Sequence, residues 1–217
     1  MSSPPPYPHP IVAREGWAFI GIALALALLV NGAAGWFLAL PFWLLFLLLL
    51  QFFRDPPRTI PAGEGIVLSP ADGRVIAIER AHDPYLERDS LKISIVSNLF
   101  NAHANRSPVD GEVKQLWRVP GRGLSTALDK ATAENERNAM WLRTAEGADV
   151  TCVQIAGHAA RRILCDAREG VSLQRGERFG FIRFDARVDL YLPLGSKACV
   201  TLGDKVQASS SVIAELP

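Results

Sequence analysis

The fold of this chain is decided by residues 93–113, which read ISIVSNLFNAHANRSPVDGEV. The stretch begins within an apolar run, LKISIV at 91–96, which is typical of a buried strand. A polar segment with one histidine, His103, follows, and it leads into the tight-turn sequence SPVDG at 107–111. A second strand-like run, GEVKQLWRV at 111–119, starts at that turn. The pattern therefore predicts two strands joined by a polar connection.

The same alternation of short apolar runs and turn residues continues on both sides. The turn sequence SPADG occupies residues 69–73, and one stretch, 125–136, has good helix formers. The remaining strand-like runs are GIVLSP at 65–70, RVIAIE at 74–79, DVTCVQIA at 149–156 and RVDLYLP at 187–193. We therefore expect residues 54–217 to form a mainly β (α+β) domain with a few short helices.

The N-terminal part of the chain has a different composition. Residues 1–16 start with a proline-rich stretch and are predicted to be a disordered tail. Residues 17–53 contain no charged side chain, which is too long an apolar run for the core helix of a soluble protein. Asn31-Gly32 interrupts the run, so two short helices near 17–30 and 36–53 would form a transmembrane or re-entrant hairpin. One long tilted helix is the alternative.

Basic residues flank the apolar run: Arg14 before it, Arg54 and Arg58 after it. Two passes with basic flanks would place both ends in the cytoplasm, whereas a single helix would move the domain to the other side. Arg54 and Arg58 either attract anionic lipid, at roughly 1 kcal/mol per basic residue near the surface, or only set the topology.

Composition excludes several classes of protein. The net charge of +1 gives no strong basic field for nucleic acid. The three cysteines form neither a disulfide framework nor a metal-type cluster, and no His/Cys or paired-carboxylate spacing predicts a metal site.

Several polar residues are candidates for chemistry, and each also has a purely structural interpretation. Asp72 lies in a turn, where aspartate commonly bonds its own backbone. His103 and His158 are isolated histidines, which more often donate a structural hydrogen bond than catalyse a reaction. Further candidates for binding substrate are the pair Arg161-Arg162, as a phosphate clamp, and the side-chain amides of Asn135 and Asn138 in NERN. Both arginines could equally be solvated surface residues.

Six motifs that occur in a fixed order indicate the function better than any single residue. They are FFRDPPR at 52–58, LSPADGRV at 68–75, ISIVSNLFNAHANRSPVDGEV at 93–113, DKATAENERN at 129–138, VQIAGHAARRILC at 153–165 and GERFGFIRF at 176–184. Together they closely resemble the short, bacterial and archaeal type of phosphatidylserine decarboxylase, from the hydrophobic segment to the C-terminus.

The resemblance implies a pyruvoyl-dependent carboxy-lyase of phospholipid biosynthesis that converts phosphatidylserine to phosphatidylethanolamine and carbon dioxide. It implies a bacterial inner-membrane protein with a cytoplasmic domain, and possible homodimers. In this family a serine attacks the carbonyl of the preceding glycine, the chain is cut, and the serine becomes the pyruvoyl group. By resemblance, His103 would transfer the proton, and Asp72 would orient it or balance its charge.

This chain departs from the family where that glycine and serine would stand, because it has Asp185-Ala186. Alanine has no hydroxyl to start the reaction, and aspartate adds a charge and a Cβ where the reaction needs a bare backbone. We therefore expect one unprocessed chain without a pyruvoyl group.

Three explanations are open: natural loss of processing, use of another serine at Gly195-Ser196, or two altered codons. The corresponding functions are a decarboxylase, or an uncleaved pseudoenzyme that binds anionic phospholipid or an active relative. A tethered β domain with a structural role is a third.

Overall fold

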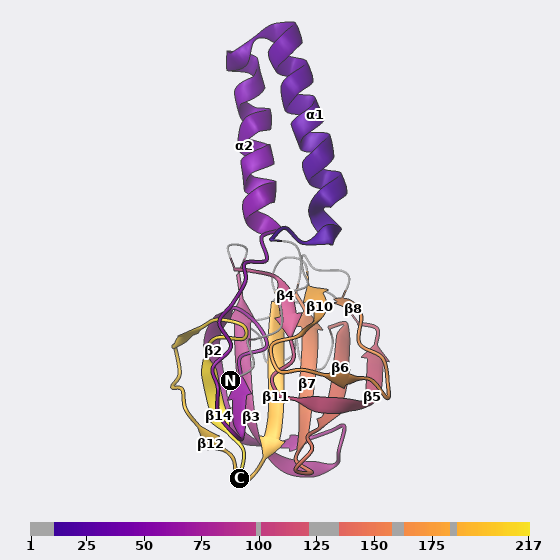
Figure 1. The fold of residues 1–217 in the computed structure, drawn as a ribbon, viewed down its shortest axis with the longest axis vertical. Helices are drawn as coiled ribbons and strands as arrows, with labels where there is room; N and C mark the ends of the chain where they lie inside the picture. The colour runs from indigo at the N-terminus through magenta and orange to yellow at the C-terminus, as the bar shows by residue number, and fades with distance from the viewer. Residues whose placement is uncertain (1–10, 99–100, 122–134, 158–162, 183–185) are drawn as a thin grey trace. The chain divides into compact units, whose positions relative to one another are not determined.

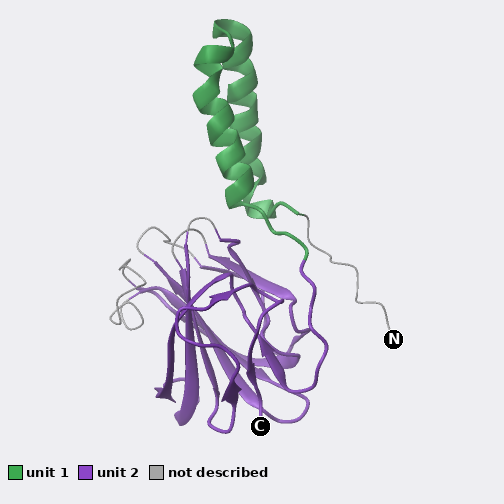
Figure 2. Ribbon diagram, turned by 90° about the vertical axis from the view of Figure 1, so that its left-hand side faces the viewer, with its two compact units in different colours: residues 1–57 green, residues 58–217 purple. Residues whose placement is uncertain are grey.

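The computed structural model describes residues 11–98, 101–121, 135–157, 163–182 and 186–217. The chain forms two compact units, residues 1–57 and residues 58–217 (Figure 2).

The first unit is a helical hairpin. A short 3-10 turn, η1 (Arg14–Gly16), leads into α1 (Trp17–Ala34), and α2 (Trp36–Phe52) returns beside it (Figure 1). Gly35 joins the helices with φ 82°, a left-handed conformation that glycine adopts without steric cost. Alanines form part of the contact, since Ala23, Ala27 and Ala39 are buried while most large apolar side chains are exposed. The hairpin replaces the alternative of one long helix.

The base of the hairpin is closed by backbone hydrogen bonds. Val12 and Arg54 form an antiparallel bridge, and the amide of Ala13 donates to the carbonyl of Phe53 at 2.7 Å. Gly16 is required here, because a Cβ on it would clash with the ring of Phe53. By length and composition, residues Arg14–Ala34 are apolar enough to cross a membrane, whereas α2 is shorter at 17 residues.

The second unit contains fourteen strands in its described part. Their bounds are β1 (Ile66–Leu68), β2 (Gly73–Asp83), β3 (Arg88–Ser97), β4 (Ala104–Arg106), β5 (Gly111–Val119), β6 (Arg137–Arg143), β7 (Asp149–Ala156), β8 (Ile163–Cys165), β9 (Ser172–Leu173), β10 (Arg178–Ile182), β11 (Ala186–Pro193), β12 (Lys197–Ala198), β13 (Lys205–Val206) and β14 (Val212–Glu215). Eight of them form one sheet in the order β13-β2-β3-β11-β7-β6-β5-β9 (Figure 1).

Strand β11 lies in the middle of this sheet, antiparallel to β3 on one side and to β7 on the other. Its side chains alternate between the two faces, as the strand period requires. Val188, Leu190 and Leu192 belong to the main hydrophobic core, while Tyr191 packs in a smaller cluster with Val153 and Ile155 of β7. Burial of each large aliphatic side chain stabilises the fold by about 2 kcal/mol.

Two small sheets, β1-β14-β12 and β4-β10-β8, contribute to the same core. The first brings Val67 and Ile213 into it, and the second brings Phe179 and Ile182. Strand β14 pairs with β1, so the C-terminus lies against the beginning of the domain.

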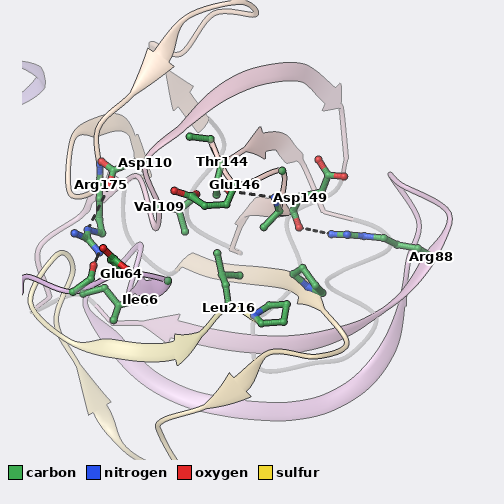
Figure 3. Close-up of a pocket in the computed structure, with 17 residues that line it drawn as sticks. Glu64, Ile66, Arg88, Val109, Asp110, Thr144, Glu146, Asp149, Arg175 and Leu216 are labelled. Carbon is green, nitrogen blue, oxygen red and sulfur yellow. Dashed lines mark hydrogen bonds and ion pairs between the residues drawn. The ribbon is translucent and has the colours of Figure 1, made fainter.

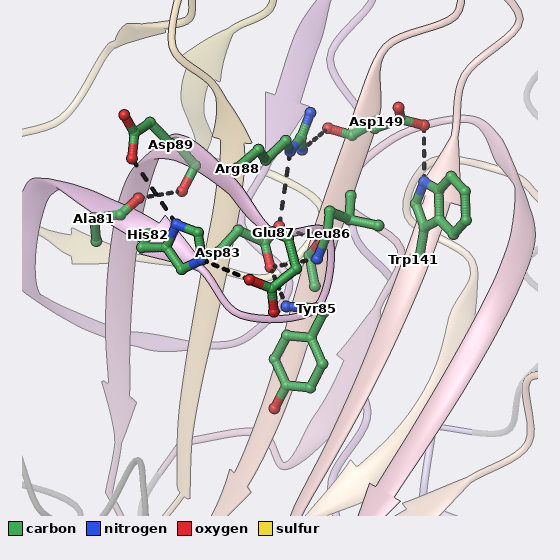
Figure 4. A network of polar contacts seen from close by, with 12 residues as sticks. Ala81, His82, Asp83, Tyr85, Leu86, Glu87, Arg88, Asp89, Trp141 and Asp149 are labelled. Carbon is green, nitrogen blue, oxygen red and sulfur yellow. Dashed lines mark hydrogen bonds and ion pairs between the residues drawn. The ribbon is translucent and has the colours of Figure 1, made fainter.

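The turn between β2 and β3 is held by a polar network (Figure 4). The buried carboxylate of Asp83 accepts hydrogen bonds from the amide of Tyr85 at 3.0 Å and from the hydroxyl of Thr151 at 2.7 Å. Arg88 reaches from the turn to the carbonyl of Asp149, 2.6 Å away. These contacts fix the turn to β7.

The mainly β architecture and all six strands expected from the sequence are confirmed. The other eight strands are not predicted by the sequence patterns. Among them, β6 begins at the end of the polar segment NERN, and β10 lies within the motif GERFGFIRF. The helix expected at 125–136 lies almost entirely outside the described residues.

Candidate active site

Asp72 lies in the turn between β1 and β2, with its side chain buried. The hydroxyl of Ser69 bonds the carbonyl of Ala71 at 2.7 Å and tightens this turn. Gly73 follows because a Cβ there would collide with the backbone of Val96 on β3. The turn SPADG thus lies close to the end of β3, next to Asp72.

Three donors hold the Asp72 carboxylate. Arg58 donates to Oδ2 at 2.7 Å, and the amide of Ala102 approaches the same oxygen at 3.4 Å. The amide of Ala208 donates to Oδ1 at 2.8 Å. The carboxylate is therefore fixed by three segments that are far apart in the sequence.

His103 immediately follows Ala102 and precedes β4, and only 3% of its surface is exposed. Its ring lies 6.0 Å from the ring of Phe181, and its carbonyl accepts a hydrogen bond from the amide of Ile182 at 3.1 Å. Through Ala102 the backbone beside His103 is tied to Asp72.

Ala186 begins β11 and is buried, with Ser97 of β3 opposite it on one side and Ala156 of β7 on the other. The hydroxyl of Ser97 bonds the backbone carbonyl of Asp72. Asp72, His103 and Ala186 therefore gather at one end of the large sheet. Asp185 lies outside the described residues.

Gly195 and Ser196 lie beyond the opposite end of β11. The amide of Ser196 closes a turn onto the carbonyl of Pro193 at 2.9 Å. Strand β11 has 8 residues, and at about 3.3 Å per residue it separates the two positions by roughly 25 Å. The structure does not bring Ser196 together with Asp72 and His103.

The other candidates for substrate binding are only partly described. The side-chain amide of Asn135 donates to the backbone carbonyl of Ala156 at 2.7 Å, next to the start of β11. Asn138 is buried and donates to Gln154 at 2.9 Å, and Gln154 in turn donates to Asn105 at 2.8 Å. His158, Arg161 and Arg162 lie outside the described residues.

Two buried arginines lie beside the site. Arg106 of β4 donates to the carbonyl of Gly176 at 3.0 Å, and Arg178 of β10 lies with its guanidinium 5.4 Å from the ring of Phe181. Burial, and then the nearby charge of Arg178, lower the pKa of Arg106 to about 10. Arg106 is thus still cationic at neutral pH, on the strand that follows His103.

Sequence reasoning missed Arg58, Ser97 and Ala208 as parts of this site. Arg58 was interpreted only as a flank of the membrane segment, and nothing in the sequence placed it near Asp72. The structure instead places Arg58 in a largely buried ion pair with Asp72.

A hollow of ≈ 650 Å³ lies elsewhere, among the loops at the other end of the large sheet (Figure 3). Val109, Ile66 and Leu216 are among its apolar lining residues, and Arg88 and Arg175 are its two arginines. Asp72, His103 and Ala186 are not among its lining residues.

The sequence matches proteins of one family over most of its length. The family model described as phosphatidylserine decarboxylase matches residues 45–214. The chain belongs to the phosphatidylserine decarboxylase family. It is 66% identical over 211 residues to a phosphatidylserine decarboxylase proenzyme of Aromatoleum aromaticum, covering 97% of this chain and 98% of the relative. Proenzymes of the same name from Nitrosomonas europaea and Burkholderia pseudomallei are 61% and 60% identical, each over at least 97% of both chains.

The family is pyruvoyl-dependent, and the residues of this chain do not fit formation of that group at position 186. The side chain there is a methyl group, which cannot act as the nucleophile of an acyl shift. The backbone around it is nevertheless held as a strand start between β3 and β7. The first residue of β11 is therefore paired on both sides although its side chain has no hydroxyl.

Proposed function

We propose that this chain is a phosphatidylserine decarboxylase precursor whose self-processing is blocked at Asp185-Ala186. With glycine at position 185 and serine at position 186 it would convert phosphatidylserine to phosphatidylethanolamine and carbon dioxide. One observation carries the proposal: Ala186 is buried at the end of the sheet where Asp72 and His103 lie, and it has no hydroxyl. The names of the relatives support the same substrate.

His103 is proposed as the residue that transfers a proton, since an imidazole exchanges protons readily near neutral pH. Asp72 is proposed to hold the surrounding backbone and to balance charge. The contact of its carboxylate with the amide of Ala102, next to His103, supports this division of roles.

The proposed location is the bacterial inner membrane, with the β domain facing the cytoplasm. The apolar helix α1 supports an anchor, and a hairpin with joined ends supports a common side for the N-terminus and the domain. Arg14 and Arg54 flank the hairpin and favour the cytoplasmic side. A homodimer, which the resemblance implied, stays a prediction.

The test is the mass of the full-length chain purified in detergent. We expect one chain of 23.7 kDa. The double substitution Asp185→Gly with Ala186→Ser should produce two chains, the smaller starting at position 186 with a blocked end. Asp185→Gly alone is the control, because it restores the glycine but no hydroxyl. A blocked fragment that starts at Ser196 would overturn the assignment of the cleavage site.

The second candidate function is an uncleaved pseudoenzyme that binds anionic phospholipid or an active relative. The pair Asp185-Ala186 favours it directly. Vesicles of phosphatidylserine and of phosphatidylcholine separate the two functions. A pseudoenzyme binds phosphatidylserine vesicles preferentially and releases no carbon dioxide. If the double variant cleaves and releases carbon dioxide while the original chain does not, the decarboxylase scaffold is intact.

A further inference from the structure

Arg58 and Asp72 form a shielded ion pair. The guanidinium Nη2 lies 2.7 Å from Oδ2 of the carboxylate, and the two side chains are only 14% and 7% exposed. Arg58 directly follows Pro56-Pro57 and is the first residue of the second unit. The pair therefore joins the first residue of the β domain to the turn before β2.

We propose that Arg58 is a positioning residue of the candidate active site, which holds the Asp72 carboxylate in place and thereby the backbone that carries His103. The proposal rests on the proposed function, because that function assigns the roles of Asp72 and His103. It adds a residue that sequence reasoning had assigned to membrane topology or lipid attraction.

The carboxylate is the point where three segments meet. Arg58 comes from the segment before β1, Ala102 from the segment before β4, and Ala208 from the C-terminal segment that follows position 186. Only Arg58 among these three brings a charge. Loss of the guanidinium would leave a buried carboxylate held by two amides, one of them at 3.4 Å.

A buried carboxylate without a partner is unfavourable, so it would turn toward water or bring water in. Either movement would release the amide of Ala102 and shift the neighbouring His103. Errors of about 1 Å in the placement of a reacting group can reduce a rate by about 100-fold. Arginine suits the role because its planar guanidinium has fixed donors, whereas the ammonium of lysine is a strongly hydrated point charge.

The pair also limits the other interpretation of Arg58. The guanidinium is only 14% exposed, and the carboxylate of Asp72 neutralises its charge, so it attracts anionic lipid weakly.

The first experiment uses the full-length Asp185→Gly/Ala186→Ser variant in detergent and follows its cleavage on a denaturing gel. Adding Arg58→Ala should slow cleavage by about 100-fold. Millimolar guanidinium should restore much of the rate, whereas urea, which is neutral and of similar shape, should not. Arg58→Lys should be intermediate. The matched control is Arg80→Ala, since Arg80 is exposed on β2 and should leave the rate unchanged. Cleavage of the Arg58→Ala variant within about twofold of its parent would overturn the proposal.

The second experiment needs no cleavage. Hydrogen exchange of the original chain is compared with that of Arg58→Ala. The amides of Ala102 and Ala208 should exchange about tenfold faster in the variant, because they bond the carboxylate that Arg58 holds. The amide of Val188, in the centre of the sheet, should not change, and guanidinium should restore the protection.

The two experiments separate the proposals. If the double variant fails to cleave but the exchange result holds, the proposed function is wrong and Arg58 still positions Asp72. Unchanged protection at both amides overturns the role of Arg58, whatever the cleavage result.

Discussion

Ala186 lies directly opposite Ser97 in the ladder between β3 and β11, and the hydroxyl of Ser97 donates a hydrogen bond to the backbone carbonyl of Asp72. One serine therefore connects the position of the family's cleavage site to the turn that carries the candidate acidic residue. The strand register and the turn geometry are coupled at this point, so a change in the turn should alter the position of residue 186, and the reverse.

Ser97→Ala should slow cleavage of the Asp185→Gly/Ala186→Ser variant, because the turn that carries Asp72 loses its tie to β3. The free energy of unfolding should fall by about 1 kcal/mol. Ser90→Ala is the matched control, since Ser90 bonds the carbonyl of Ala81 at 2.8 Å at the other end of the same strand pair. We expect similar losses of stability and slower cleavage only for Ser97→Ala. Equal cleavage rates for the two variants would contradict this coupling.

A buried ion pair directly follows the proposed cleavage position. Nε of Arg187 lies 2.7 Å from Oδ1 of Asp189, and the same guanidinium bonds the hydroxyl of Ser94 at 3.1 Å. Arg187→Met or Asp189→Leu alone should each reduce the free energy of unfolding by about 3–5 kcal/mol, because each leaves a buried charge. The double substitution should cost much less than the sum. Chemical unfolding of the four proteins measures this cycle, and additive losses would show that the charges do not interact.

The sequence was sufficient for the family, the hairpin and the central strands, because these depend on local patterns. The uncharged run from 17 to 53 with glycines in its middle predicts two helices, and alternating runs predict strands such as β3 and β11. The position of the break was wrong by a few residues, because α1 continues through Asn31-Gly32 to Ala34 and the chain turns at Gly35. The family motifs also drew attention to Asp72 and His103, which the structure brings to one end of the sheet.

The contacts of the site could not be predicted in the same way. Arg58 and Asp72 are 14 residues apart, and Asp72 and Ala208 are 136 residues apart. The pattern of apolar and polar residues does not predict such contacts, because they depend on how β1, β2 and the C-terminal segment pack together. Strand β6 was not predicted for a related reason, because its polar beginning, Arg137-Asn138, does not resemble a buried strand. In the structure the side-chain amide of Asn138 is buried and donates a hydrogen bond to Gln154.

The carboxyl group of Asp149 should make stability depend on pH in the acid range. Burial raises its pKa, but hydrogen bonds from Arg143 and Trp141 and the charge of Arg143 outweigh burial and hold the pKa below the usual 3.8. Figure 4 shows the contact between Asp149 and Trp141. A lowered pKa in the folded state stabilises the protein above the unfolded value and loses this effect as the pH falls through the folded value.

Asp149→Asn should therefore lower stability at neutral pH, and its difference from the original chain should shrink below about pH 3.8. Unfolding at several pH values measures the difference, with Arg143→Gln as a second variant that removes the same pair. A difference that is constant down to the lowest pH would contradict the assignment.

The three thiols should react with an alkylating reagent in a fixed order. Cys199 is exposed, Cys165 is partly buried and Cys152 is fully buried. Burial raises the pKa of both Cys152 and Cys165, so less of the reactive thiolate is present at pH 8. We expect Cys199 to be modified first, Cys165 more slowly, and Cys152 only after unfolding, as mass spectrometry of peptides can show. Early modification of Cys152 would mean that β7 is not buried as described.

The small chain produced by the restored variant should stay bound to the large chain. Residues 186–217 include β11, which pairs with β3 and β7, and β14, which pairs with β1. Cleavage before position 186 removes one covalent link but none of these ladders, and Val188, Leu190 and Leu192 each keep about 2 kcal/mol of burial. Gel filtration in detergent should therefore give one particle containing both fragments, with the uncleaved Asp185→Gly variant as the size control. Loss of the small fragment without denaturant would mean that the uncut connection, rather than the sheet, holds β11 in place.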